Sequence, residues 1–119
     1  MEDSRKEQIE ALEVLVEFNE RLVKNLKIVV KELSGARLED TDNFIKGIID
    51  AMNWEIQVMN STMDVLNDGK ERINKEAFNR NITAVAEAVK DKDDAKLAKA
   101  FEEVIPCFEA LGVAGAEVI

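Results

Sequence analysis

The carboxylate side chains are the part of this sequence whose spacing could support chemistry. Glu17 and Glu20 are three residues apart, and Glu39 and Asp42 repeat that spacing further along the chain. Residues three apart share one face of a helix, so each pair could present two carboxylates to one divalent cation. Mg²⁺ prefers such oxygen ligands and can join them to substrate phosphates. The pairs therefore raise the hypothesis of a divalent-cation site.

In this order the two pairs resemble the magnesium motif of all-α nucleotide pyrophosphohydrolases, in which carboxylates on facing helices hold the cation. The resemblance implies that Glu17, Glu20, Glu39 and Asp42 are ligands. However, Glu17 and Glu20 fall on the polar side of a predicted helix, and Asp42 falls in a loop or first helical turn. We therefore expect four solvated carboxylates and predict no catalytic residue, no metal and no cofactor. A Mg-dependent pyrophosphohydrolase remains the alternative function.

The sequence contains no histidine. This excludes histidine phosphotransfer and the Ser-His-Asp and Cys-His catalytic arrangements, and it removes the usual ligand of many zinc and haem sites. A di-iron helical bundle is also disfavoured, because its Glu-x-x-His pairs cannot form. Carboxylate chemistry is what the composition leaves open, and we predict a protein that is not an enzyme.

Four helices must position any site. Apolar residues recur every three or four positions, and the first such seam is interrupted only by Asn19. Ser34-Gly35, Asn67-Asp68-Gly69 and Gly112 are typical helix ends. We predict an all-α antiparallel up-down four-helix bundle in one domain, residues 1–119, with an irregular tail at 112–119. The predicted helices cover residues 5–33 and 41–66, which are long, and 75–90 and 94–111, which are shorter.

Unequal helices should leave one end of the long hairpin uncovered. Apolar residues at that end would form an exposed cluster, which is typical of a dimer interface or of a groove for a partner helix. Trp54 and Val58 lie beside the seam of the second helix, where Trp54 could equally be core or interface. The predicted protein-binding surface consists of Val29, Val30, Leu33, Phe44, Ile48, Trp54 and Val58.

Three methionines, Met52, Met59 and Met63, share one face of the second predicted helix. Methionine is common at surfaces that bind varied apolar partners, but it also fills gaps in ordinary cores. We favour the core and leave the interface open.

The net charge of −9 indicates which partners are disfavoured. Lysine and arginine are interleaved with acidic residues everywhere, so we expect no nucleic acid and no anionic membrane as partner. The first residues lack the apolar run of a signal peptide, and the single cysteine, Cys107, cannot form an internal disulfide. We therefore expect a cytoplasmic protein whose partner is another protein or a second copy of itself.

The segment from Ala77 to Gly112 carries the sequence Ala-Val-Ala-Glu-Ala-Val, the turn Lys-Asp-Lys-Asp-Asp and the helix Leu-Ala-Lys-Ala-Phe-Glu-Glu-Val-Ile-Pro. It resembles a family of small uncharacterised bacterial helical-bundle proteins, a domain of unknown function. Size, acidity and helix layout are also similar to cytosolic flagellar and secretion export chaperones, which cradle the helical end of a client. We expect a non-enzymatic helical binding protein that acts as an adaptor, a chaperone or a homodimer.

Overall fold

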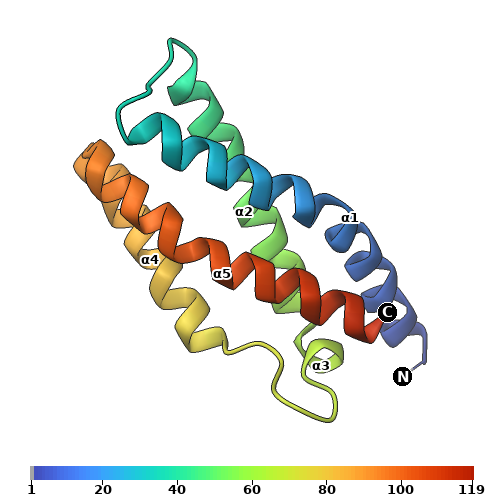
Figure 1. Cartoon of the computed structure of the whole chain (residues 1–119). Helices are drawn as coiled ribbons and strands as arrows, with labels where there is room; N and C mark the ends of the chain where they lie inside the picture. Colours follow the sequence, from blue (N-terminus) through green and yellow to red (C-terminus); the bar gives the residue numbers. More distant parts are fainter. Residues whose placement is uncertain (1) are drawn as a thin grey trace.

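The computed structural model describes residues 2–119, with side chains from Ser4 onward. The described chain is helical and has no strand, which confirms the all-α prediction (Figure 1). Its five helices are α1 (Glu2–Leu33), α2 (Thr41–Ser61), α3 (Met63–Leu66), α4 (Lys75–Asp91) and α5 (Asp94–Val118).

The long helix α1 runs the full length of an elongated molecule that measures 48 × 24 × 19 Å. At about 1.5 Å per residue, its 32 residues account for the longest dimension. The most extensive packing is between α1 and α5, while α2 packs on α1 and α4 packs on α5 (Figure 1). The core is therefore centred on the α1–α5 pair, and its largest fully buried side chains include Leu12, Leu15, Leu26, Phe101, Phe108 and Leu111.

The second predicted helix, residues 41–66, is interrupted at Thr62, so its prediction as one element is wrong. The hydroxyl of this buried residue donates to the carbonyl oxygen of Val58 at 2.6 Å. Thr62 itself has φ −119° and ψ 12°, outside the helical region. A threonine hydroxyl that bonds to backbone carbonyls competes with the helical ladder. The chain consequently turns there and continues as the short helix α3.

The predicted irregular tail at 112–119 is also wrong, because α5 continues to Val118 and passes through the exposed Pro106. Gly112 does not end the helix. Its Cα faces Asn19 of α1 so closely that an added Cβ would lie 2.1 Å from Asn19 Oδ1. Gly115 meets Val16 in the same way, at 2.9 Å. These glycines serve the close approach of α5 to α1 instead of closing a helix.

As a result, α5 is longer than α2, and the predicted division into two long helices followed by two short ones does not hold. The end of the α1–α2 hairpin is also not left bare. Arg37, in the connector after α1, contacts Asp94 at the start of α5 at 2.9 Å and Asp42 in α2 at 2.8 Å. Leu33, at the last turn of α1, is buried.

Other predicted boundaries differ by a few residues. α1 begins at Glu2, before the predicted start at residue 5, whereas α4 begins at Lys75 as predicted, where Asn74 caps it by accepting the Ala77 N–H at 3.1 Å. Within residues 2–119, no helix has the length and apolarity that a membrane crossing requires.

Candidate functional site

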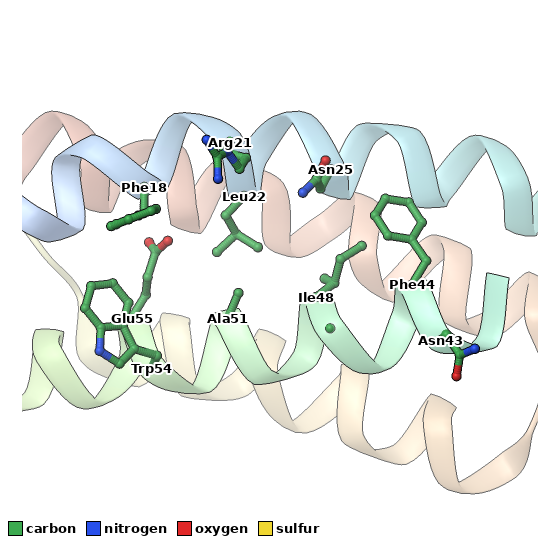
Figure 2. A pocket seen from close by; sticks show the side chains of 11 residues that line it. Phe18, Arg21, Leu22, Asn25, Asn43, Phe44, Ile48, Ala51, Trp54 and Glu55 are labelled. Carbon is green, nitrogen blue, oxygen red and sulfur yellow. The ribbon is translucent and has the colours of Figure 1, made fainter. Parts of the chain in front are cut away.

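An apolar groove of about 490 Å³ lies between α1 and α2 (Figure 2). This volume falls in the range of sites that bind small molecules, roughly 300–1,000 Å³. Four lining residues come from α1 and the others from α2. They are Phe18, Arg21, Leu22 and Asn25, followed by Asn43, Phe44, Gly47, Ile48, Ala51, Trp54 and Glu55.

The groove exists because small residues occupy the middle of the α2 face that lines it. Gly47, Ala51 and Trp54 recur at steps of four and three, which places them on one side of the helix. A Cβ added at Gly47 would have no neighbouring atom within 4 Å, so this glycine borders open space. Large side chains at both ends and small ones between them leave a hollow.

Two aromatic rings form one end of the groove. The rings of Phe18 and Trp54 meet edge to face, with centroids 6.2 Å apart and planes at 87°. These side chains are 45% and 39% exposed, although both are large and apolar. The guanidinium carbon of Arg21, which also lines the groove, lies over the Phe18 ring at 5.9 Å from its centroid. Neighbouring exposed aromatic rings are typical of a binding surface.

A buried polar pair lies at the same end. Glu55 is 1% exposed and Asn19 is 6% exposed. Asn19 Nδ2 donates to Glu55 Oε1 at 2.9 Å and to the carbonyl oxygen of Phe108 in α5, also at 2.9 Å. With Gly112 of α5 against its amide oxygen, Asn19 is held between α2 and α5. The pair thus fixes the point where α1, α2 and α5 meet.

Burial determines the charge of Glu55, the ionisable member of this pair. It raises the pKa of the Glu55 carboxyl from 4.5 to about 7, while the hydrogen bond from Asn19 acts in the opposite direction. Removal of a carboxylate from water disfavours its charged form, and a single neutral donor compensates only in part. Glu55 therefore changes its protonation state near neutral pH, at the wall of an apolar groove.

Two smaller apolar grooves lie elsewhere on the surface. One, of about 240 Å³, separates α2 from α4 and is lined by residues such as Met52 and Val85. The other, of about 320 Å³, lies between α1 and α5, where the carboxylates of Glu20 and Glu109 are exposed. Among the described residues that line these two grooves, none is a buried carboxylate, which distinguishes the α1–α2 groove from both.

Only part of the predicted binding surface borders the α1–α2 groove. Phe44, Ile48 and Trp54 line it. Val29 and Leu33, which we expected to be exposed, are buried in the core, and so is Ile48 although it lines the groove. The remaining two, Val30 and Val58, are half-buried and pack against the core.

The three methionines belong to the core, which is the location that we favoured from the sequence. Met52 and Met59 are buried, and Met63 packs against the core. Each has neighbours from the protein itself, so these side chains fill the interior of the helical assembly.

The carboxylates of the alternative function, Glu17, Glu20, Glu39 and Asp42, are all exposed. Asp42 is paired with Arg37. No three acidic or cysteine side chains in residues 4–119 come close enough to hold a metal ion together. The geometry therefore lends no support to the four-carboxylate magnesium site.

Sequence reasoning missed Phe18, Gly47 and Glu55. One signal was available for Glu55, because it lies three residues after Met52 and four before Met59, both on the core face of the helix. A glutamate at that position interrupts the seam of α2, just as Asn19 interrupts the seam of α1. Two polar interruptions in helices expected to be neighbours indicate a buried pair.

Residues 10–113 match one protein family. No match was found among curated proteins, and none among solved structures. The matched region includes the whole α1–α2 groove and the polar pair beneath it. Because the match covers most of the chain, the protein belongs to the family described as a domain of unknown function (DUF8042).

Proposed function

We propose that this chain is a non-enzymatic binding protein that holds an apolar ligand in the α1–α2 groove. The observation that carries the proposal is the groove itself, about 490 Å³ in volume, with Phe18 and Trp54 partly exposed at one end. Exposure of large aromatic rings to water is unfavourable by the hydrophobic effect. An occupant that covers them would recover that free energy, which gives binding its driving force.

The proposal also keeps the wider expectations from the sequence. These are a cytoplasmic location, no nucleic-acid or membrane partner, and action as an adaptor, an export-type chaperone or a homodimer. The antiparallel up-down order of four main helices belongs here too, and it is supported by the short connectors at residues 34–40, 67–74 and 92–93. The proposed contact surface is the groove in the middle of α1 and α2, and no longer the end of the hairpin.

Binding of a neutral apolar dye, N-phenyl-1-naphthylamine, tests the proposal. We expect saturable binding that raises dye fluorescence and alters the emission of Trp54, the only tryptophan of the chain. Gly47→Leu should abolish binding by filling the groove, because open space surrounds this position. The matched control, Gly47→Ala, adds one methyl group and should retain most of the binding.

Two results would contradict the proposal. One is dye binding that does not saturate, and the other is saturable binding that Gly47→Leu leaves unchanged. Light scattering of the same samples reports whether a second copy fills the groove. In that case wild-type protein is a dimer, and Gly47→Leu is a monomer with unchanged helix content.

A further inference from the structure

We propose that the occupant of the α1–α2 groove is a small apolar primary amine, with its ammonium group at Glu55 and its hydrocarbon chain directed along α2 toward Phe44. This inference rests on the proposed function, because it requires the groove to be a binding site. It adds the chemical class of the ligand.

The hydrogen bonding of the Glu55 carboxylate is incomplete. Among the described residues, the one hydrogen bond to its carboxylate comes from Asn19 and reaches Oε1. A carboxylate can accept several hydrogen bonds, so Oε2 retains its accepting capacity. In Figure 2 the carboxylate extends from α2 toward Phe18 of α1, beside Trp54. A donor group in the aromatic end of the groove would therefore find an acceptor there.

The Glu55 carboxylate also lacks a partner of opposite charge. Glu55 has no cation of the described chain as its hydrogen-bond partner, since Asn19 is neutral and Arg21, a cation that also lines the groove, is exposed and stacks over the Phe18 ring instead. On the opposite side of α1, Glu20 and Glu109 line a separate groove and are exposed. A cationic ligand would supply the missing partner, whereas an anionic ligand would place like charges together.

The aromatic rings favour the same choice. Phe18 and Trp54 flank the carboxylate, and an ammonium group is attracted to the face of an aromatic ring, most strongly to tryptophan. A primary amine can make both contacts, because it carries three donors around one positive charge. The net charge of −9 adds a long-range attraction for any cation.

The rest of the groove suits a hydrocarbon chain. Beyond Glu55 its walls are formed mainly by Ala51, Ile48 and Phe44 of α2 and by Leu22 of α1. At about 1.5 Å per residue, Phe44 lies about 16 Å from Glu55 along the helix axis. This length suits a straight alkyl chain of medium length, and the small residues Gly47 and Ala51 keep the path open.

The protonation of Glu55 should make the affinity for an amine depend on pH. The raised pKa of Glu55, about 7, means that the free protein is largely neutral at this site at pH 6 and largely ionised at pH 8. An ammonium group binds the ionised form, so binding releases a proton from Glu55. Affinity for the amine should therefore increase about tenfold from pH 6 to pH 8, because the ionised fraction increases by that factor.

Three straight-chain probes test the inference: decylamine, decanol and decanoate, each below its micelle-forming concentration. Titration at pH 8, followed by Trp54 fluorescence and calorimetry, should give an amine affinity about tenfold or more above that of the alcohol, with decanoate weakest. Glu55→Gln keeps an acceptor for Asn19 and should reduce the amine preference to about threefold or less. It should also remove the pH dependence. Glu103→Gln, which changes an exposed glutamate, should alter neither.

Each outcome has one meaning. Equal affinity for the amine and the alcohol, with both lost in Gly47→Leu, overturns the amine inference and leaves the proposed binding function in place. An amine preference that persists in Glu55→Gln also overturns it, because the attraction then comes from the acidic surface as a whole. Failure of all three probes overturns both proposals. If scattering shows a dimer that the amine does not dissociate, a second copy is the occupant instead.

Discussion

Asn19 Nδ2 lies 2.9 Å from Glu55 Oε1, and this hydrogen bond joins two buried polar side chains at the place where α1, α2 and α5 meet. A buried carboxyl with one neutral donor is stable when protonated and unfavourable when ionised. The core of this helical protein therefore contains a carboxyl group, that of Glu55, whose charge changes near neutral pH. Its contribution to the free energy of unfolding must change with pH.

The first prediction concerns stability against pH. Because the folded-state pKa of Glu55, about 7, exceeds its ordinary value of 4.5, the folded protein binds more protons than the unfolded chain between these values. The free energy of unfolding should thus fall as pH rises from 5 to 8, by up to about 3 kcal/mol. Glu55→Gln should remove this decline and be the more stable protein at pH 8. Urea unfolding at several pH values measures both.

The control for this experiment is Glu103→Gln, which removes a carboxylate that is already exposed to water. Its stability profile should follow that of the wild type. A wild-type profile that is flat from pH 5 to 8, or one that rises, would show that Glu55 is ionised without difficulty in the folded protein and would contradict the first prediction.

The second prediction concerns Asn19. Asn19→Ala removes the donor and leaves the Glu55 carboxyl and the Phe108 carbonyl oxygen without their partner. We expect a loss of about 1–3 kcal/mol in stability, larger at pH 8 than at pH 5.5, and a pKa of Glu55 above that of the wild type. NMR of the Glu55 side-chain carboxyl reports the pKa directly. Asn25→Ala, a half-buried asparagine of the same helix, should leave this pKa unchanged.

Part of this site could be predicted from sequence. Asn19 interrupts an otherwise apolar seam, and Glu55 occupies a core position between Met52 and Met59. Periodicity gives the buried face of each helix, but it does not give the axial register of one helix against another. That register depends on interhelical packing, so the contact between Asn19 and Glu55 follows only from the assembled structure.

The errors in the predicted fold have physical causes of the same kind. Glycine is the usual residue after a helix, so Gly112 indicated an end. Its real role depends on a neighbour, Asn19, which lies far away in sequence. Thr62 was an unremarkable residue in an apolar pattern, and its hydroxyl ends α2 by binding the carbonyl oxygen of Val58. Local signals predicted the apolar faces of the helices well and the positions of the helix ends poorly. Tertiary contacts decide whether a helix ends at a given residue when the local preferences are similar.

The third prediction compares two glycines in helix interiors. Gly112→Ala should destabilise the protein by about 1–3 kcal/mol, because its Cβ would lie 2.1 Å from Asn19 Oδ1 and would force the polar pair apart. Gly47→Ala should stabilise it by about 0.5–1 kcal/mol, because the new Cβ meets no atom within 4 Å and alanine is the better helix former. Thermal and urea unfolding measure both. Equal effects of the two substitutions would contradict this reading of Gly112.

The final prediction concerns the last turns of α5, which the sequence led us to expect as an irregular tail. Two residues after Gly112 contribute contacts: Ala114 is buried, and Glu117 forms an ion pair with Arg72 at 2.9 Å. A chain that ends at Gly112 should therefore lose stability, on the order of 2 kcal/mol, in urea unfolding. Glu117→Gln separates the two contributions, because it removes only the ion pairs of Glu117 with Arg72 and Lys70 and should cost no more than about 1 kcal/mol. A truncated chain as stable as the full one would contradict this prediction, because it would mean that the contacts of α5 beyond Gly112 do not stabilise the protein.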